Sequence, residues 1–233
     1  MHYFYTPFVL DDSHTLNPEE SRHCIKVLRK KVGQHIELVD GQGGIYKGAI
    51  IQDHPKKCEL KIVSKEKKVN PLKIHLHLAV APTKNNDRFE WFLEKATEIG
   101  ISEITPIICS HSERKVIKTE RMKNILVSAM KQSNRCYLPL LNEAILFEQF
   151  ITKDIPGHRY IAHCHDVKKQ SLQHATYKGQ NTLVMIGPEG DFSESEIQMA
   201  KQNGFKDVTL ASSRLRTETA AVVACHTLNL INQ

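Results

Sequence analysis

The chain has 233 residues, of which 40% are hydrophobic and 25% charged, so it can bury a substantial core and is not intrinsically disordered. No segment reaches the apolar length that crosses a bilayer, and the start lacks the marks of a signal peptide. We therefore expect a cytoplasmic chain of one or two domains, without a membrane span. The formal net charge of +6 allows an anionic partner but does not identify one.

The six cysteines are scattered without CxxC spacing, which argues against a disulfide framework and against a thiolate zinc site. We expect them to be reduced thiols. Among the 13 histidines, His163 and His165 would share one face of a strand and could meet one metal ion. No further ligand pair at a useful spacing supports them, so the sequence predicts no metal site.

The first 69 residues have the pattern of a small β-rich domain. A hairpin is expected over residues 33–53, because alternating apolar residues flank the turn DGQGG, and another strand is expected over residues 58–64. One short helix is expected over residues 18–28. Five basic residues without an acid occupy residues 22–31. Such a run is most often a solvated face, but it is also typical of a nucleic-acid footprint.

The pattern changes at the VNPLK segment near residue 70, after which strands alternate with helices. Residues 87–100 predict a helix that Asp87 caps and Gly100 ends, with an apolar stripe between them. This alternation predicts an α/β domain with a mainly parallel sheet covered on both faces. The expected strands are residues 73–80, 104–108, 159–164, 182–186 and 207–211, and the other expected helices are residues 119–133, 193–203 and 217–231.

The sequence GPEG directly follows the expected strand over residues 182–186, and ligands of open parallel sheets bind beyond the carboxyl ends of strands. Gly187 and Gly190 allow positive φ and a close backbone approach, and Ser193 with Glu196 predicts a capping box. For the glycines alone, a tight strand-to-helix connection explains the pattern equally well. Neither GxGxxG after a strand nor a P-loop motif occurs, so pyrophosphate is not the expected ligand.

A second loop, LASSRLRTETA, leads into the last expected helix. Thr217 is the expected N-cap and Glu218 complements the helix dipole, and capping alone can explain both residues. Arg214 and Arg216 are not needed for capping, so they favour an anionic substrate. The final helix is apolar nearly all round and must be covered by the rest of the fold or by another subunit.

Four segments in order resemble one family over nearly the whole chain. LVMIGPEGDFSESE with LASSRLRTETAA is similar to the signature of the SPOUT superfamily of RNA methyltransferases, in particular the bacterial 16S rRNA (uracil-N3)-methyltransferase family. RHCIKVLRKKVGQHIELVDGQGGIYKGAI resembles the N-terminal PUA-like RNA-binding domain of that family. KNNDRFEWFLEKATEIGISEITPI and SAMKQSNRCYLP resemble its mid-chain motifs.

The resemblance implies a PUA-like β-barrel over residues 1–69 and a SPOUT methyltransferase domain over residues 70–233. A trefoil knot is implied near residues 183–231, which would be a rare exception to unknotted topology. S-adenosylmethionine is the implied cofactor, 16S rRNA or the small ribosomal subunit the implied substrate, and a homodimer built partly by the last helix the implied assembly. The family usually has glycine where this chain has Asp191 and Ala211. We expect activity to be retained, because Ala211 is small and aspartate tolerates unusual φ.

The same resemblance assigns roles to single residues. Arg216 would face the substrate and stabilise the developing uridine anion, while Glu218 or Glu189 would accept the proton, a choice that stays open. The implied cofactor-binding residues are Ile186, Gly187, Gly190, Leu210, Leu215 and Thr217. The implied RNA-binding residues are Arg22, Lys26 and Arg29 in the first domain and Arg88, Arg114 and Arg135 in the second, although solvated surface is as common a role for any one of them.

Two other classes of protein stay open on the sequence. The chain could be an RNA-binding module with a non-catalytic α/β domain, in which case it would bind RNA but not S-adenosylmethionine. It could also be an oxidoreductase with an unusual nucleotide loop, although the missing GxGxxG motif counts against that class.

Overall fold

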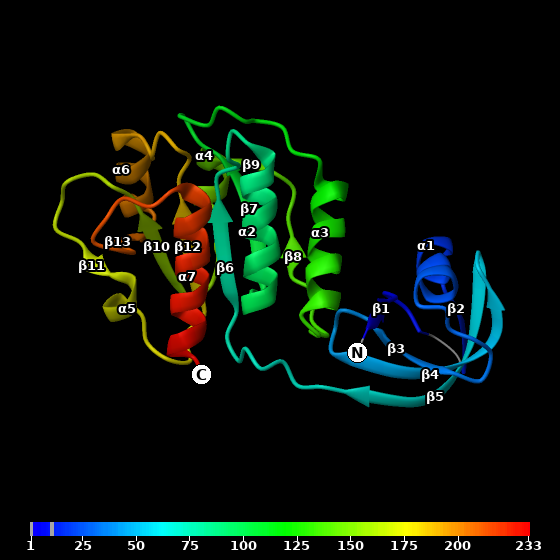
Figure 1. The fold of residues 1–233 in the computed structure, drawn as a ribbon. Coiled ribbons are helices and arrows are strands. Elements are labelled where there is room, and N and C mark those ends of the chain that lie inside the picture. Colours follow the sequence, from blue (N-terminus) through cyan, green and yellow to red (C-terminus); the bar gives the residue numbers. More distant parts are fainter. Residues whose placement is uncertain (1, 10–11) are drawn as a thin grey trace. The chain divides into compact units, whose positions relative to one another are not determined.

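The computed structural model describes residues 2–9 and 12–233, so Met1, Leu10 and Asp11 of the expected first domain lie outside the described residues. The chain folds into two compact units (Figure 1). One unit consists of Met1–Pro71 and Val127–Leu138, and the other consists of Leu72–Leu126 and Pro139–Gln233. A segment from the middle of the chain thus belongs to the N-terminal unit, which the sequence pattern does not predict.

A five-stranded sheet in the order β1-β3-β4-β5-β2 forms the N-terminal unit. The predicted hairpin is confirmed, because β3 and β4 pair antiparallel around the DGQGG turn. In that turn the Asp40 carboxylate accepts hydrogen bonds from the backbone N–H groups of Gln42 and Gly44. The strands are β1 (Tyr3–Tyr5), β2 (Ser13–Thr15), β3 (His35–Val39), β4 (Gly44–His54) and β5 (Lys57–Lys67).

The helix expected over residues 18–28 forms in two parts. α1 (Pro18–Arg22) starts at Asn17, whose side-chain oxygen accepts a hydrogen bond from the Glu20 N–H at 2.8 Å. It continues as a π-helical turn, η1 (His23–Val27), in which the Leu28 N–H donates to the His23 carbonyl. Sequence periodicity predicts the helix but not this wider turn.

The segment over residues 127–138 is held in the N-terminal unit by an ion pair and by apolar packing. Lys131 Nζ lies 2.6 Å from the carboxylate of Glu20, which is buried in α1. Apolar side chains from this segment and from the sheet share one core, formed by Tyr3, Val39, Ile45, Met130 and Cys136.

An eight-stranded sheet forms the second unit, and all its described pairings are parallel. The strand order is β11-β13-β10-β12-β6-β7-β8, with β9 beside β7. The chain runs from β6 to β7 toward the β8 end of the sheet, and from β12 to β13 toward the β11 end. The strand order therefore reverses between β12 and β6. The strands are β6 (Leu76–Val80), β7 (Glu103–Ile108), β8 (Leu140–Leu141), β9 (Ile145–Leu146), β10 (His158–Ala162), β11 (Gln170–Ser171), β12 (Thr182–Ile186) and β13 (Lys206–Thr209).

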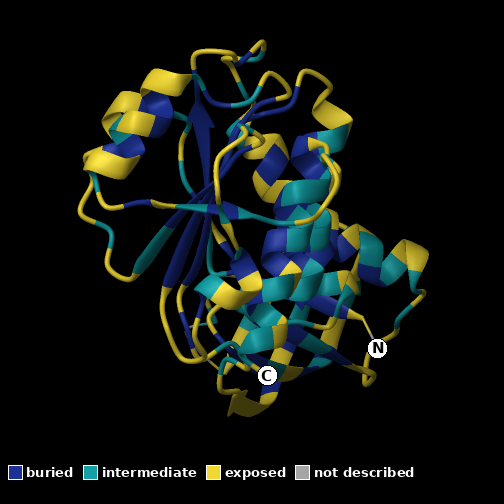
Figure 2. Ribbon diagram, turned by 90° about the vertical axis from the view of Figure 1, so that its left-hand side faces the viewer, coloured by how far each residue is buried: buried dark blue, intermediate teal, exposed yellow. Residues whose placement is uncertain are grey.

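Helices cover both faces of this sheet, so the predicted α/β class is confirmed. α2 and α7 lie side by side on one face (Figure 1), while α4 and α6 pack on the other against Ala79, Ile161 and Met185. Figure 2 shows the strands as buried and the outer sides of the helices as exposed. The helices are α2 (Asn86–Ile99), α3 (Thr119–Gln132), α4 (Phe147–Ile151), α5 (Leu172–Ala175), α6 (Glu194–Gln202) and α7 (Thr217–Ile231). Among the described residues no helix is long and apolar enough to cross a membrane.

The predicted boundaries of α2 and α6 hold, but the predicted cap of α2 is wrong. Asn85, not Asp87, caps α2, because the Asn85 side-chain oxygen accepts a hydrogen bond from the Asp87 N–H at 3.0 Å. Gly100 ends the helix with a φ of 114°, as predicted. The capping box of Ser193 and Glu196 is also confirmed at the start of α6.

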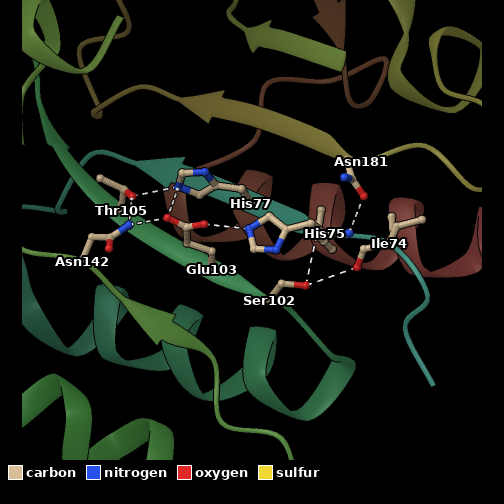
Figure 3. A network of polar contacts seen from close by, with 9 residues as sticks. Ile74, His75, His77, Ser102, Glu103, Thr105, Asn142 and Asn181 are labelled. Carbon is tan, nitrogen blue, oxygen red and sulfur yellow. Dashed lines mark hydrogen bonds and ion pairs between the residues drawn. The ribbon is translucent and has the colours of Figure 1, made fainter. Parts of the chain in front are cut away.

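A polar network lies at the amino ends of β6 and β7 (Figure 3). His77 is buried there, with Nε2 2.8 Å from Thr105 Oγ1, and burial lowers its pKa to about 4. Asn142 donates to both Glu103 and Thr105, and the ring of His75 lies 2.6 Å from Glu103. This network therefore holds a neutral imidazole in the core at neutral pH, at the opposite edge of the sheet from the β12 loop.

Candidate functional site

A cavity of about 330 Å³ lies at the carboxyl ends of β10, β12 and β13, and β12 is one of the two strands between which the strand order reverses. Small-molecule sites span roughly 300–1,000 Å³, so the volume suits such a ligand. The strands expected over residues 159–164 and 207–211 end two residues early, and the residues after them form loops that line the cavity. The lining comes from residues 162–164, 186–189, 191, 208–211, 213–217 and 220.

Most of the predicted cofactor-binding residues meet at this cavity. Gly190 is the exception, because it lies outside the lining. The predicted residues that line the cavity are Ile186, Gly187, Leu210, Leu215 and Thr217.

Thr217 joins the two loops that the sequence singles out. Its hydroxyl donates to the carbonyl oxygen of Gly187 at 3.1 Å, and the side chain is buried. The prediction that Thr217 is the N-cap of the last helix is wrong: Arg216 occupies that position and makes no capping hydrogen bond with its side chain. The Thr217 hydroxyl is therefore a tie between loops, which local capping rules do not anticipate.

The two glycines of the GPEG loop serve close packing. Neither glycine has a positive φ, and the left-handed residue of this loop is Asp191, with a φ of 65°. A Cβ atom at position 187 would lie 3.0 Å from the Phe192 ring, and one at position 190 would lie 2.9 Å from the Cβ of His111. Side chains there would push the loop away from its neighbours.

The loop over residues 187–193 is tied to three further loops of the same edge. These contacts tie together the loops that follow four strands (β6, β7, β10 and β12), and they occupy one oxygen of Glu189. Glu189 Oε1 accepts from the Lys84 N–H at 3.0 Å, His111 Nδ1 lies 3.1 Å from the Gly190 carbonyl oxygen, and Asp191 Oδ2 accepts from the Cys164 N–H at 2.7 Å.

The two predicted catalytic residues differ in setting. Arg216 is exposed and lines the cavity. Glu218 is buried in the first turn of α7 and lies outside the lining. Its Oε1 lies 3.8 Å from Nε of Arg88, and its Oε2 has no hydrogen-bond partner among the described residues.

The predicted RNA-binding cations divide between the two units. Arg22, Lys26 and Arg29 are exposed in or just after the helix of the N-terminal unit. Arg135 was expected in the second domain, but it belongs to the N-terminal unit. Arg114 of the second unit donates through Nε and Nη2 to the Lys84 carbonyl at 3.1 and 2.7 Å, so its guanidinium also fixes a loop.

His163 and His165 lie in the loop after β10 and not in a strand. The side chain of His163 is fully buried, with Nε2 3.3 Å from Asp207 Oδ1, and burial lowers its pKa. The two imidazole rings pack edge to face, with their centroids 5.5 Å apart. In the part of the chain that the structure describes, no group of three or more His, Cys, Asp and Glu side chains could hold a metal ion.

The wall formed by residues 162–164 is the part of the site that the sequence interpretation missed. A signal for it exists, because β10 is a parallel strand and its carboxyl end lies on the ligand-binding edge. The sequence pattern was interpreted as a possible metal site at His163 and His165, but these residues directly follow the end of β10.

Family models match both units. An RNA methyltransferase domain model matches residues 70–229, and an RNA methyltransferase PUA domain model matches residues 16–63. The chain is 31% identical over 214 residues to the ribosomal RNA small subunit methyltransferase E of Rickettsia conorii, covering 90% of this chain and 86% of that protein. It is 30% identical over 237 residues to the enzyme of that name from Aquifex aeolicus, covering 90% and 96%.

Solved structures agree with these matches. A probable rRNA methyltransferase from Porphyromonas gingivalis is 38% identical with a TM-score of 0.93, covering 100% of this chain and 98% of the other. A ribosomal RNA small subunit methyltransferase E from Neisseria gonorrhoeae, bound to S-adenosylmethionine, is 28% identical with a TM-score of 0.87, covering 100% and 98%. The family predicted from the sequence is thus confirmed, and the chain belongs to the ribosomal RNA small subunit methyltransferase E family, with a PUA domain before its RNA methyltransferase domain.

Proposed function

We propose that this chain transfers a methyl group from S-adenosylmethionine to N3 of a uridine in the 16S rRNA of the small ribosomal subunit. The observation that carries the proposal is the cavity between the GPEG loop and the loop before α7, which the Thr217–Gly187 hydrogen bond holds together. Relatives from Neisseria gonorrhoeae and Legionella pneumophila bind S-adenosylmethionine, and curated relatives are named for small-subunit ribosomal RNA.

The residues of the cavity fit a nucleoside cofactor. Ile186, Leu210 and Leu215 offer apolar surface for a flat base, and loop backbone offers hydrogen-bonding groups that can fix its orientation. We propose that these residues, with Gly187 and Thr217, hold the cofactor. Gly190 would act indirectly, because its missing side chain lets the loop pack on His111. The bound cofactor supplies an electrophilic methyl group on a sulfonium centre.

The residues of this chain would then align the target and manage its proton. N3 of uridine lies on the base-pairing edge, so the base has to be unpaired or flipped out to be reached. Alignment of the two reactants can account for about 7–11 kcal/mol of the barrier in well-oriented systems. We assign Arg216 to the developing uridine anion and Glu218 to the N3 proton. Glu218 is favoured over Glu189, because one oxygen of Glu189 already accepts the Lys84 N–H.

We further propose that cations of both units, three of them exposed and three half-buried, contact the RNA backbone. Phosphate contacts from arginine and lysine position an RNA, while the cavity selects the base. Arg114 would contact RNA only through the part of its guanidinium that the Lys84 carbonyl leaves available. The cations are Arg22, Lys26, Arg29, Arg88, Arg114 and Arg135.

The remaining proposals concern architecture. We propose an RNA-binding module over residues 1–69, a methyltransferase domain over residues 70–233 with a trefoil knot near residues 183–231, and a cytoplasmic location with the ribosome. A homodimer is supported by α7: Ala221, Ala224 and Leu228 are buried within the chain, but Leu230 is 58% exposed. A second copy of the chain would cover the side of α7 on which Leu230 lies.

The test combines binding with mapping of the product. Calorimetry should show that purified chain binds S-adenosylmethionine, and small-subunit RNA from cells with the protein should carry an N3-methyluridine that is missing from cells without it. RNA affinity without S-adenosylmethionine binding would favour a non-catalytic RNA-binding module. Retention of NAD(P) on the purified protein would favour an oxidoreductase.

A further inference from the structure

Asp191 has an unusual backbone for a residue with a side chain. Its φ of 65° lies in the left-handed region, which only Arg29 and Asn134 share among the other described non-glycine residues. Aspartate is tolerated there better than most residues, and glycine would fit without strain. The side chain therefore needs a reason other than the turn itself.

The carboxylate of Asp191 bridges two loops. Oδ2 accepts a hydrogen bond from the Cys164 N–H at 2.7 Å, and Oδ1 accepts one from the Phe192 N–H at 2.8 Å. Hydrogen bonds to an ionised acceptor are about twice as strong as neutral ones. Asp191 thus holds its own turn and the loop after β10 through one charged group.

Both residues of the Asp191–Cys164 bond lie at the cavity. Asp191 and Cys164 belong to its lining, and so does His163, whose side chain is buried beneath the loop. Two other contacts of this loop each have at least one partner outside the lining: His165 Nε2 lies 2.9 Å from the Phe192 carbonyl, and Lys169, which is not part of the lining, donates to the carbonyl of His163 at 2.7 Å. The Asp191–Cys164 bond is therefore a tie that acts at the cavity wall itself.

We propose that Asp191 is a positioning residue that fixes the wall over residues 162–164 and thereby sets the affinity of the cavity for the methyl donor. The inference rests on the proposed function, because it takes S-adenosylmethionine as the ligand. Asp191 does not take part in methyl transfer, so its loss affects binding of the donor and not the chemical step.

Three variants separate this role from a plain turn requirement. Asp191→Gly keeps the left-handed turn and removes both hydrogen bonds. Asp191→Asn keeps the size of the side chain but leaves a single oxygen to accept. Asn134→Gly is the matched control, since it makes the same kind of change at a left-handed position with a φ of 54° in the other unit.

Two measurements test the role of Asp191 at the wall over residues 162–164: the affinity for S-adenosylmethionine and the reactivity of Cys164. Calorimetry gives the dissociation constant for S-adenosylmethionine. Cys164 is exposed while the other five cysteines are buried, so fast reaction with a thiol reagent reports on Cys164, and Cys164→Ser assigns the signal. In Asp191→Gly the dissociation constant should rise about tenfold or more, and Cys164 should react faster even without cofactor.

Asp191→Asn should fall between wild type and Asp191→Gly in both measurements, with little change in melting temperature. Asn134→Gly should match wild type in both. In the methylation assay, KM for S-adenosylmethionine should rise in Asp191→Gly while kcat stays within about twofold, since uniform binding is what is lost.

The possible failures are distinguishable. If the wild-type protein does not bind S-adenosylmethionine, both the proposed function and the role of Asp191 in donor binding are wrong. If wild type binds and both Asp191 variants bind equally tightly with unchanged Cys164 reactivity, only the inference is overturned. If Asp191→Gly does not fold, Asp191→Asn tests the inference by itself. Wild-type affinity for S-adenosylmethionine in Asp191→Asn would contradict a role for the carboxylate.

Discussion

Nε of Arg88 lies 3.8 Å from Oε1 of Glu218, and this ion pair joins the first turns of α2 and α7 beside the carboxyl edge of the sheet. The carboxylate is buried and its second oxygen has no hydrogen-bond partner among the described residues. A buried charge beside one cation and with a spare oxygen can accept a proton or hold the cation in place.

We expect Glu218→Gln to lower kcat about 100-fold or more while the protein stays folded, because general bases contribute roughly 10²–10⁴-fold. The double variant with Arg88→Ala should lose little more than Glu218→Gln alone, since the two side chains interact. Single-turnover methylation rates measure both. Normal turnover in Glu218→Gln would remove Glu218 as the proton acceptor.

Thr217→Val should weaken both the fold and donor binding. The change keeps the shape of the side chain but leaves the Gly187 carbonyl without its donor, which costs roughly 1–3 kcal/mol for a buried group. Chemical denaturation and calorimetry check the two effects. Thr217→Ser should restore most of both, and Thr227→Val, the same change farther along α7, should leave S-adenosylmethionine affinity as in wild type.

Arg216→Ala should abolish methylation without unfolding the chain, because the side chain is exposed and makes no capping hydrogen bond. Removing one donor from a developing anion costs about 10²–10³ in kcat in comparable sites. Arg216→Lys should recover part of the rate by keeping the charge. Circular dichroism verifies the fold, and full turnover in Arg216→Ala would exclude Arg216 from the mechanism.

The free energy of unfolding should fall as the pH drops from about 6.5 toward 4. Burial lowers the pKa of His77 from 6.5 to about 4, so the unfolded chain binds a proton in this window that the folded chain does not. The difference corresponds to at most roughly 3 kcal/mol. The charge of Glu103 raises the pKa of His77, and those of His75 and Lys153 lower it.

Denaturation curves at a series of pH values measure this loss. His77→Gln should flatten the slope between pH 6.5 and 4, while His75→Gln, a change at a half-exposed neighbour in the same network, should keep it. An unchanged slope in His77→Gln would assign the acid sensitivity to other groups.

RNA affinity should decrease steeply with added salt, because cations that contact phosphates release counterions. Replacing Arg22, Lys26 and Arg29 with glutamine should reduce the slope of log affinity against log salt by about 0.7 for each lost contact with single-stranded RNA. Lys57→Gln is a suitable control, since Lys57 already pairs with Glu59 at 2.8 Å. A flat salt profile in wild type would contradict the cationic footprint.

Local patterns in the sequence predict most elements of this fold. The DGQGG hairpin, the helix that Gly100 ends and the capping box at Ser193 depend on neighbouring residues, so turn, capping and periodicity rules find them. The same rules misplace the cap of α2 by two residues, because Asn85 and Asp87 are both good capping residues and only backbone geometry selects between them.

By itself, the amino-acid sequence determined that the chain is an α/β protein with a β-rich N-terminal domain, and its motifs identified the family and the two loops of the site. The tertiary structure alone decided the partners of the loop side chains: Thr217 bonds to Gly187, Asp191 bonds to Cys164, and Glu218 pairs with Arg88. Periodicity and capping depend on residues a few positions apart, whereas these contacts join residues far apart in the chain that meet only when parallel strands bring their carboxyl ends to one edge.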